Sequence, residues 1–299
     1  MKRTLFWGGM FCSCVVIIIG SVYWWWFKAP HQLMANVVYG QRDEKPLLLD
    51  VFRPPEPNGA GVILMVSGGW KSGPGSVQPF LFAPFLRRGY TVFAVRHISQ
   101  PECLIGEIVQ DMNRSVRFIR HHAGDYGVDG NRLGVIGGSS GGHLSLMLGT
   151  RGGPGDPNAV DEIDRESSAV QCVACFYPPT DLLNLGTSTE NPGDGGPPKS
   201  FRKGFGPKAE AMETWKIVGR ELSPIYFITP KLPPILIVHG DADTLVTLDQ
   251  SQRFTDKAKA LGLNVELQIR PGKGHGWPTM VFDIMRFADW FDEHLAAGK

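Results

Sequence analysis

The chain has 299 residues, of which 42% are hydrophobic and 20% are charged, and its formal net charge is +1. This composition is typical of a globular protein with room for one large α/β domain, and the near-neutral charge argues against a nucleic-acid-binding surface. The five cysteines set no disulfide or metal framework. Cys172 and Cys175 lie three apart on a predicted strand and therefore point to opposite faces, so buried core thiols are expected and neither a metal nor a cofactor is predicted.

The N-terminal segment has the pattern of a membrane anchor. Lys2 and Arg3 precede the uncharged residues 5–27, a run long enough to span a bilayer as a helix, and it closes on a tryptophan cluster at residues 24–26. We predict a single-pass signal anchor over residues 1–28, with the domain that follows it in the periplasm or outside the cell. Secretion after cleavage of a signal peptide is the alternative.

Strands alternate with helices through the rest of the chain. Strands are predicted over residues 47–52, 61–66, 91–95, 133–136, 169–177, 234–238 and 265–269, and helices over residues 79–88, 105–122, 143–148, 248–260 and 279–295. This alternation predicts a mostly parallel, doubly wound sheet in one domain, residues 35–299.

A long stretch rich in Gly, Pro, Ser and Asn interrupts this pattern. Such stretches inside a compact domain are usually lids or disordered, so residues 183–221 are predicted to form a small cap or lid over the site. Its large apolar residues are predicted either to line an acyl or aromatic pocket or to pack the lid onto the body: Phe201, Phe205, Met212 and Trp215.

A strand-turn-helix at residues 133–148 carries the pattern G-x-S-x-G. Gly138, Ser140 and Gly142 match it, with an apolar run before and a helix-forming run after. A serine on such a strained turn needs glycine two residues before and after it, and the N–H of Gly141 would then face a developing oxyanion. The alternatives are a plain glycine-rich turn or a phosphate loop.

A second glycine turn follows the buried strand at residues 61–66. Gly68 and Gly69 leave N–H groups free to point at a ligand and, with Trp70, complete the predicted oxyanion and substrate-binding set. A plain turn is the alternative. His97 follows the strand at residues 91–95. It is the alternative to His275 as the catalytic base.

Two further loops leave the same edge of the predicted sheet. Asp243 follows one buried strand and His275 the next, so both are expected beside Ser140. The order serine, acid, histidine is that of α/β-hydrolases, with Ser140 as nucleophile, His275 as base and Asp243 as the anchor of the base. Asp241 is the alternative acid, and His239 is expected to hold the turn by hydrogen bonds.

These motifs together resemble one known family. The segments SGGWKSG, YGVDGNRLGVIGGSSGGHLSLML, HGDADTLV and GKGHGWP are similar to α/β-hydrolases of the esterase/lipase type, namely acetyl-esterases and BD-FAE-like carboxylesterases. The resemblance implies the α/β-hydrolase fold and the roles just given. Ser67 departs from the family's H-G-G-G-W pattern.

The function expected from this resemblance is that of a serine esterase. It would cleave short-chain acyl or carbohydrate acetyl esters through an acyl-enzyme, with a small-molecule or carbohydrate ester as substrate and the membrane as a partner through the N-terminal helix. A prolyl-oligopeptidase-like peptidase or amidase and a non-catalytic binding protein are the alternatives.

Overall fold

The computed structural model describes residues 20–22, 24, 25 and 28–296. Eight strands form one sheet in the order β1-β2-β4-β3-β5-β6-β7-β8. The strands are β1 (Gln32–Arg42), β2 (Lys45–Arg53), β3 (Gly59–Met65), β4 (Thr91–Val95), β5 (Val128–Gly138), β6 (Cys172–Phe176), β7 (Ile235–Gly240) and β8 (Val265–Arg270). The β1–β2 and β2–β4 pairs are antiparallel, and all other pairs are parallel.

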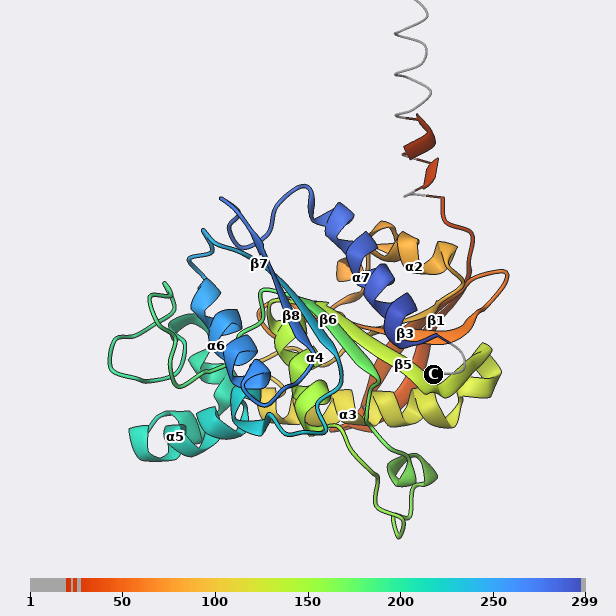
Figure 1. The fold of residues 1–299 in the computed structure, drawn as a ribbon. Coiled ribbons are helices and arrows are strands. Elements are labelled where there is room, and N and C mark those ends of the chain that lie inside the picture. The colour runs from red at the N-terminus through yellow and green to blue at the C-terminus, as the bar shows by residue number, and fades with distance from the viewer. Residues whose placement is uncertain (1–19, 23, 26–27, 297–299) are drawn as a thin grey trace, which may run out of the picture.

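Helices cover both faces of this sheet (Figure 1). One face carries α2 (Ala83–Arg87) and α7 (Met280–His294), and the other carries α3 (Ile105–His121), α4 (Ser140–Arg151) and α6 (Leu248–Lys259). The helix α5 (Met212–Glu221) belongs to the 183–221 segment, which also holds short 3₁₀ turns at Lys199–Phe205 and Pro207–Ala209. Further 3₁₀ turns are Pro74–Ser76, Pro79–Phe82, Ala123–Tyr126, Glu162–Arg165 and Pro224–Phe227.

The central strands are buried on both sides, as parallel strands between two helical layers must be. Every residue of β4, β6 and β7 is buried. Along β3 the side chains alternate: Ile63 and Met65 join the core under α3 and α4, while Val62 and Leu64 face α2 and α7. The continuous apolar runs in the sequence therefore mark the middle of the sheet.

The predicted α/β-hydrolase fold and all seven predicted strands are confirmed. The edge strand β1 and the helix α5 were not predicted. The predicted helix at residues 79–88 begins as the 3₁₀ turn Pro79–Phe82 and continues as α2. Cys172 and Cys175 are buried free thiols, as expected, and Cys103 is a third buried free thiol.

The predicted N-terminal membrane anchor needs correction. Most of residues 1–28 lie outside the described residues, and the part of the chain that is described contains no helix long and apolar enough to cross a bilayer. The single-pass anchor and the extracytoplasmic location inferred from it are therefore not supported.

Candidate active site

Three side chains form a hydrogen-bonded chain at the carboxyl edge of the sheet. Ser139 follows β5, Asp243 follows β7 and His275 follows β8. The Nε2 atom of His275 lies 2.9 Å from Ser139 Oγ, and its Nδ1 atom lies 2.7 Å from Asp243 Oδ2. Because a carboxylate can only accept, Nδ1 carries the proton and Nε2 presents its lone pair to the serine hydroxyl. This is the arrangement in which an imidazole can take a proton from a serine.

The predicted pairing of Ser140 with His275 is wrong, because Ser139 occupies that place. The sequence GGSSGG contains G-x-S-x-G in two overlapping frames, and the backbone selects the earlier one. Ser139 has φ 54° and ψ −121°, a strained conformation for a residue other than glycine. It lies on the sharp turn between β5 and α4, as a nucleophile elbow requires.

The glycines around the turn show why the earlier frame fits. A Cβ atom on Gly137 would lie 2.3 Å from the carbonyl oxygen of Gly141, and one on Gly141 would lie 2.6 Å from that of Met65. A Cβ atom on Gly138 would have its nearest neighbour at 3.6 Å, which is ordinary contact. A Cβ atom on Gly142 would also be too close, at 2.9 Å from the carbonyl oxygen of Phe176. The two frames therefore differ at the position two residues before the serine, where Gly137 must be glycine and Gly138 need not be.

Ser140 belongs to a second polar chain that runs behind the elbow. His97 Nδ1 lies 2.8 Å from the carbonyl oxygen of Ile98 and therefore donates to it, which leaves Nε2 as an acceptor for the Ser67 hydroxyl at 2.9 Å. Ser67 Oγ then accepts from Ser140 Oγ at 3.0 Å, and Ser140 Oγ accepts from the N–H of Trp70 at 2.9 Å. The single proton of the Ser140 hydroxyl is committed to Ser67.

His97, considered as a rival base, is a member of this chain. Burial lowers the pKa of His97 below its ordinary value, so the ring is neutral at neutral pH. Its Nε2 atom contacts Ser67. Ser67, which departs from the family pattern, thus connects the glycine turn after β3 to the end of β4.

The buried carboxylate of Asp243 is held by several donors. Its Oδ1 atom accepts from the N–H groups of Leu245 and Val246 at 2.9 and 3.0 Å. Burial alone would raise the pKa of Asp243, but hydrogen bonds from His239 and His275 outweigh burial and hold it well below its usual value. The group is therefore charged at neutral pH.

The neighbouring predicted residues have supporting contacts. His239 is fully buried between Ser251 Oγ at 2.7 Å and the carbonyl oxygen of Val246 at 2.8 Å, which agrees with its expected role in the turn. Asp241, the alternative acid, accepts instead from the N–H of Gly272 at 2.6 Å. It braces the loop that carries His275.

Only some of the predicted oxyanion donors are available. The N–H of Gly68 donates to the carbonyl oxygen of Lys71 at 3.0 Å, and that of Trp70 donates to Ser140. The N–H of Gly69, at φ +57°, has no acceptor among the described residues. Gly141 does not line the cavity. The N–H directly after Ser139 is that of Ser140, which opens α4 and so has no acceptor within the helix.

The buried indole of Trp70 holds the glycine turn after β3 in place. It is 2% exposed, and its Nε1–H donates to Nδ1 of His143 at 3.2 Å. His143 Nε2 in turn donates to the carbonyl oxygen of Leu222 at 2.7 Å. Burial lowers the pKa of His143 to about 4, so this ring is neutral and keeps one tautomer. Trp70 acts here through its packing and its backbone.

A cavity of about 790 Å³ opens above Ser139 and His275. Gly68, Gly69 and Trp70 line it, and so do residues of the 183–221 segment. The four apolar residues of this segment were expected either to line a pocket or to pack the segment onto the body, and Phe201 lines the cavity. Phe205 and Trp215 are buried against the body, and Met212 is exposed.

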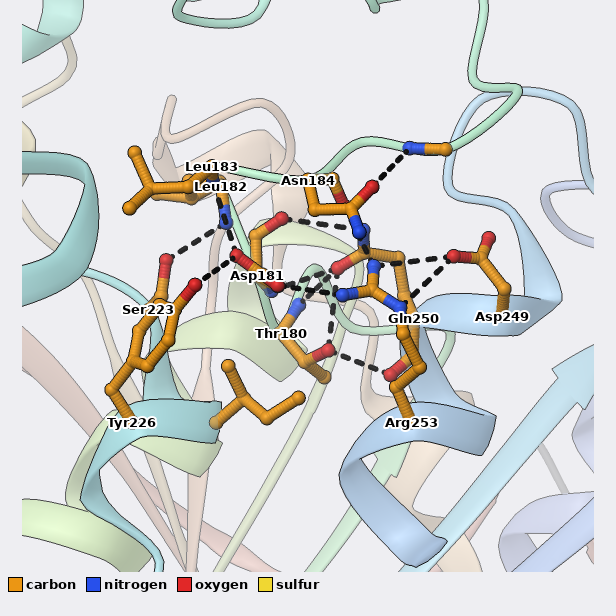
Figure 2. A network of polar contacts seen from close by, with 12 residues as sticks. Thr180, Asp181, Leu182, Leu183, Asn184, Ser223, Tyr226, Asp249, Gln250 and Arg253 are labelled. Atoms are coloured by element: carbon orange, nitrogen blue, oxygen red, sulfur yellow. Dashed lines mark hydrogen bonds and ion pairs between the residues drawn. The ribbon is translucent and has the colours of Figure 1, made fainter. Parts of the chain in front are cut away.

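A polar network anchors the start of the 183–221 segment (Figure 2). Gln250 of α6 accepts from the backbone N–H groups of Thr180 and Asp181 at 2.9 and 2.8 Å. Arg253 donates to Asp181 Oδ2 at 2.6 Å and to the carbonyl oxygen of Asn184 at 2.6 Å. The segment thus leaves the body from a fixed point, and its role as a lid stays a prediction.

Within the described part of the chain, no cluster of three or more His, Cys, Asp or Glu side chains could hold a metal ion. With its own side chains alone, this arrangement can carry out nucleophilic attack by an activated hydroxyl.

The BD-FAE family model matches residues 49–258. The chain belongs to the BD-FAE family. The matched range includes Ser139 and Asp243 and ends before His275. The family confirms the predicted resemblance, and the sheet order and helical layers above are those of an α/β-hydrolase.

Relatives of known name are esterases. Esterase LipC of Mycobacterium tuberculosis is 27% identical over 256 residues, which cover 82% of this chain and 60% of LipC. Isoprenylcysteine alpha-carbonyl methylesterase ICME of Arabidopsis thaliana is 25% identical, over 82% of this chain and 56% of that protein. The chain therefore spans somewhat more than half the length of these relatives.

Solved structures of similar fold are also esterases. A truncated carbohydrate esterase from gut microbiota superposes with a TM-score of 0.71 at 25% identity, over 88% of this chain and 96% of that one. The apo form of Thermogutta terrifontis esterase 2 gives a TM-score of 0.68 at 25% identity, over 89% and 95% of the two chains. Carboxylic ester hydrolases are thus the class of enzyme that this chain resembles in both sequence and fold.

Proposed function

We propose that the protein is a serine esterase in which Ser139 is the nucleophile, His275 the general base and Asp243 the residue that orients the base. The continuous hydrogen-bonded chain from Ser139 Oγ through the imidazole to the Asp243 carboxylate carries this proposal. The strained backbone of Ser139 and the family of the chain support it.

The reaction follows from these positions. Ser139 Oγ attacks the ester carbonyl carbon while its proton passes to His275 Nε2, and the charged Asp243 stabilises the imidazolium. The N–H groups of Gly69 and Ser140 donate to the developing oxyanion. The imidazolium then protonates the departing alcohol, which leaves an acyl-enzyme on Ser139. A water molecule then attacks the acyl carbon while His275 takes its proton, and the imidazolium returns that proton to Ser139 Oγ as the acid is released.

The substrates that we propose are short-chain acyl esters and carbohydrate acetyl esters. The similarity to a carbohydrate esterase supports the second of these. Hydrolysis of p-nitrophenyl acetate tests the first class, and hydrolysis of an acetylated xylan tests the second. Turnover of an aminoacyl-naphthylamide would detect peptidase activity.

Covalent labelling tests the assignment of the nucleophile. A fluorophosphonate probe should modify the wild-type protein and the Ser140→Ala variant, and peptide mass spectrometry should find the label on Ser139. The Ser139→Ala variant should take up no label. Label on Ser140, or no label on a folded wild-type protein that turns over p-nitrophenyl acetate, would refute the proposal.

A further inference from the structure

The cavity above Ser139 has two chemically different sides. One side, under the 183–221 segment, includes the polar residues Ser188, Glu190 and Thr247. The other side lies between the sheet and α7, and we call it the α7 side. Its walls are aliphatic and aromatic: Leu64, Leu81, Ile136, Phe176, Val281 and Ile284.

On the α7 side, the cavity extends as far as the side chains of the central strand β3. Leu64 lies in the middle of β3, which pairs with β4 and β5 on its two sides, yet its side chain is only partly buried. A closed core would bury it, as it buries Val62 on the same face. Leu81, Met280 and Val281 border the same core and are also only partly buried. An apolar hollow therefore separates the sheet from the beginning of α7.

This hollow begins at the reacting groups. The ring of His275 lies over that of Tyr177, with centroids 4.4 Å apart. The hydroxyl of Tyr177 lies 3.5 Å from Met280 Sδ and donates to it, at the start of α7. One ester molecule can therefore place its carbonyl group at Ser139 and extend another part into the hollow.

Polar substrates do not fit the α7 side. A sugar hydroxyl buried without a hydrogen-bond partner costs free energy, and the walls named above offer no polar side-chain atoms. The polar groups near this side are Ser76, at the exposed rim, and the hydroxyl of Tyr177, which donates to Met280 Sδ. A cavity of this total volume is in the range that holds drug-sized ligands, far larger than an acetyl group needs.

We propose that the α7 side binds an extended apolar group of the ester, so that the preferred substrates carry a hydrocarbon chain or ring system on one side of the ester bond. This inference rests on the proposed esterase function. It is compatible with a short acyl group when the alcohol is apolar. Of the two substrate classes proposed above, it therefore favours acyl esters with an apolar half over carbohydrate acetyl esters, whose two halves are small and polar.

Two substrate series test the proposal on the full chain. One lengthens the acyl group of p-nitrophenyl esters from acetate to octanoate, and the other lengthens the alcohol of alkyl acetates from ethyl to octyl, below the concentrations at which either aggregates. Each buried methylene should raise kcat/KM by up to about fourfold, so one series should rise at least about tenfold. The series that rises identifies the half that enters the α7 side.

Variants at the wall localise the effect. Val281→Phe and Leu81→Phe, at two residues of the wall, should remove most of the gain with chain length and bring the ratio of kcat/KM for the longest ester to that for the acetate down toward one. Met285→Phe, on the same helix as Val281 but outside the cavity, should leave this ratio unchanged. A thermal melt confirms that each variant is folded.

Two results would overturn the proposal. One is a kcat/KM that stays flat or falls with chain length in both series. The other is a wall variant, folded like the wild type, that affects short and long substrates equally. In either case Ser139-dependent hydrolysis of p-nitrophenyl acetate would still support the esterase, whereas absence of all ester hydrolysis would refute the proposed function itself.

Discussion

Two adjacent serines in the elbow take part in two different polar chains. Ser139 faces the cavity and contacts His275, while Ser140 is 1% exposed and contacts Ser67 behind the glycine turn. Each chain contains a histidine, but only the first one ends on a charged carboxylate. The comparison shows that the strained turn, which sends neighbouring side chains in different directions, assigns the chemistry to one of two identical residues.

The largest effect is expected from exchanging these serines for alanine one at a time. Ser139→Ala should lower kcat on p-nitrophenyl acetate by at least about 10⁴-fold, because among the described residues Ser139 supplies the one hydroxyl that is hydrogen-bonded to His275 Nε2. Ser140→Ala should cost about tenfold, since its N–H remains at the oxyanion position. Steady-state kinetics measures both, and equal losses would remove the distinction between the two chains.

Variants of the two aspartates after β7 test which carboxylate orients His275 in the first chain. Asp243→Asn should lower kcat by about 10² to 10⁴-fold, because the amide neither fixes the tautomer of His275 nor stabilises its cation. Asp241→Asn is the matched control, since the side chain of Asp241 accepts from the Gly272 N–H and, within the described part of the chain, does not contact His275. Its kcat should stay within about threefold of the wild-type value; a larger loss there would point to Asp241 as the orienting acid.

Ser67→Ala tests the second chain. The change leaves the hydroxyl of Ser140 without its acceptor and His97 Nε2 without its donor, so the turn that carries Gly69 should shift. We expect about a tenfold loss in kcat with little change in KM, because an oxyanion donor acts mainly in the transition state. Ser76→Ala, an exposed serine on the rim of the same cavity, should change neither. A KM effect alone at Ser67 would contradict a role in positioning this turn.

The last prediction concerns the pH dependence of folding and not the rate of catalysis. His143 has a pKa of about 4 in the folded protein, below the ordinary value of 6.5, because it is buried. The unfolded chain therefore binds the proton first, and the stability from this residue is complete above about pH 6.5 and is lost as the pH falls toward 4. The loss amounts to about 3 kcal/mol at most.

Urea unfolding at several pH values measures this loss. His143→Gln, whose amide can accept from Trp70 and donate to Leu222, should flatten the fall in unfolding free energy between pH 7 and pH 4.5. An unchanged slope in the variant would show that other groups, such as the buried His97, carry the effect.

Much of the fold was predictable because it depends on local pattern. The apolar runs of β3, β4 and β7 and the periodicity of α3 gave their type and place within a few residues. The strand β1 was missed because its residues are mostly exposed at the sheet edge, where the buried pattern is absent. In the same way, the loops that hold Asp243 and His275 followed from parallel topology, which brings the carboxyl ends of strands together.

The sequence by itself determined the α/β-hydrolase class and the meeting of an aspartate and a histidine at one edge of the sheet. Only the tertiary structure decided which serine of GGSSGG meets them. That choice depends on distances between backbone atoms, at Gly137 and Gly141, that no residue pattern records. The apolar hollow beside α7 is likewise a property of packing, since the same side chains a short distance closer would form an ordinary core.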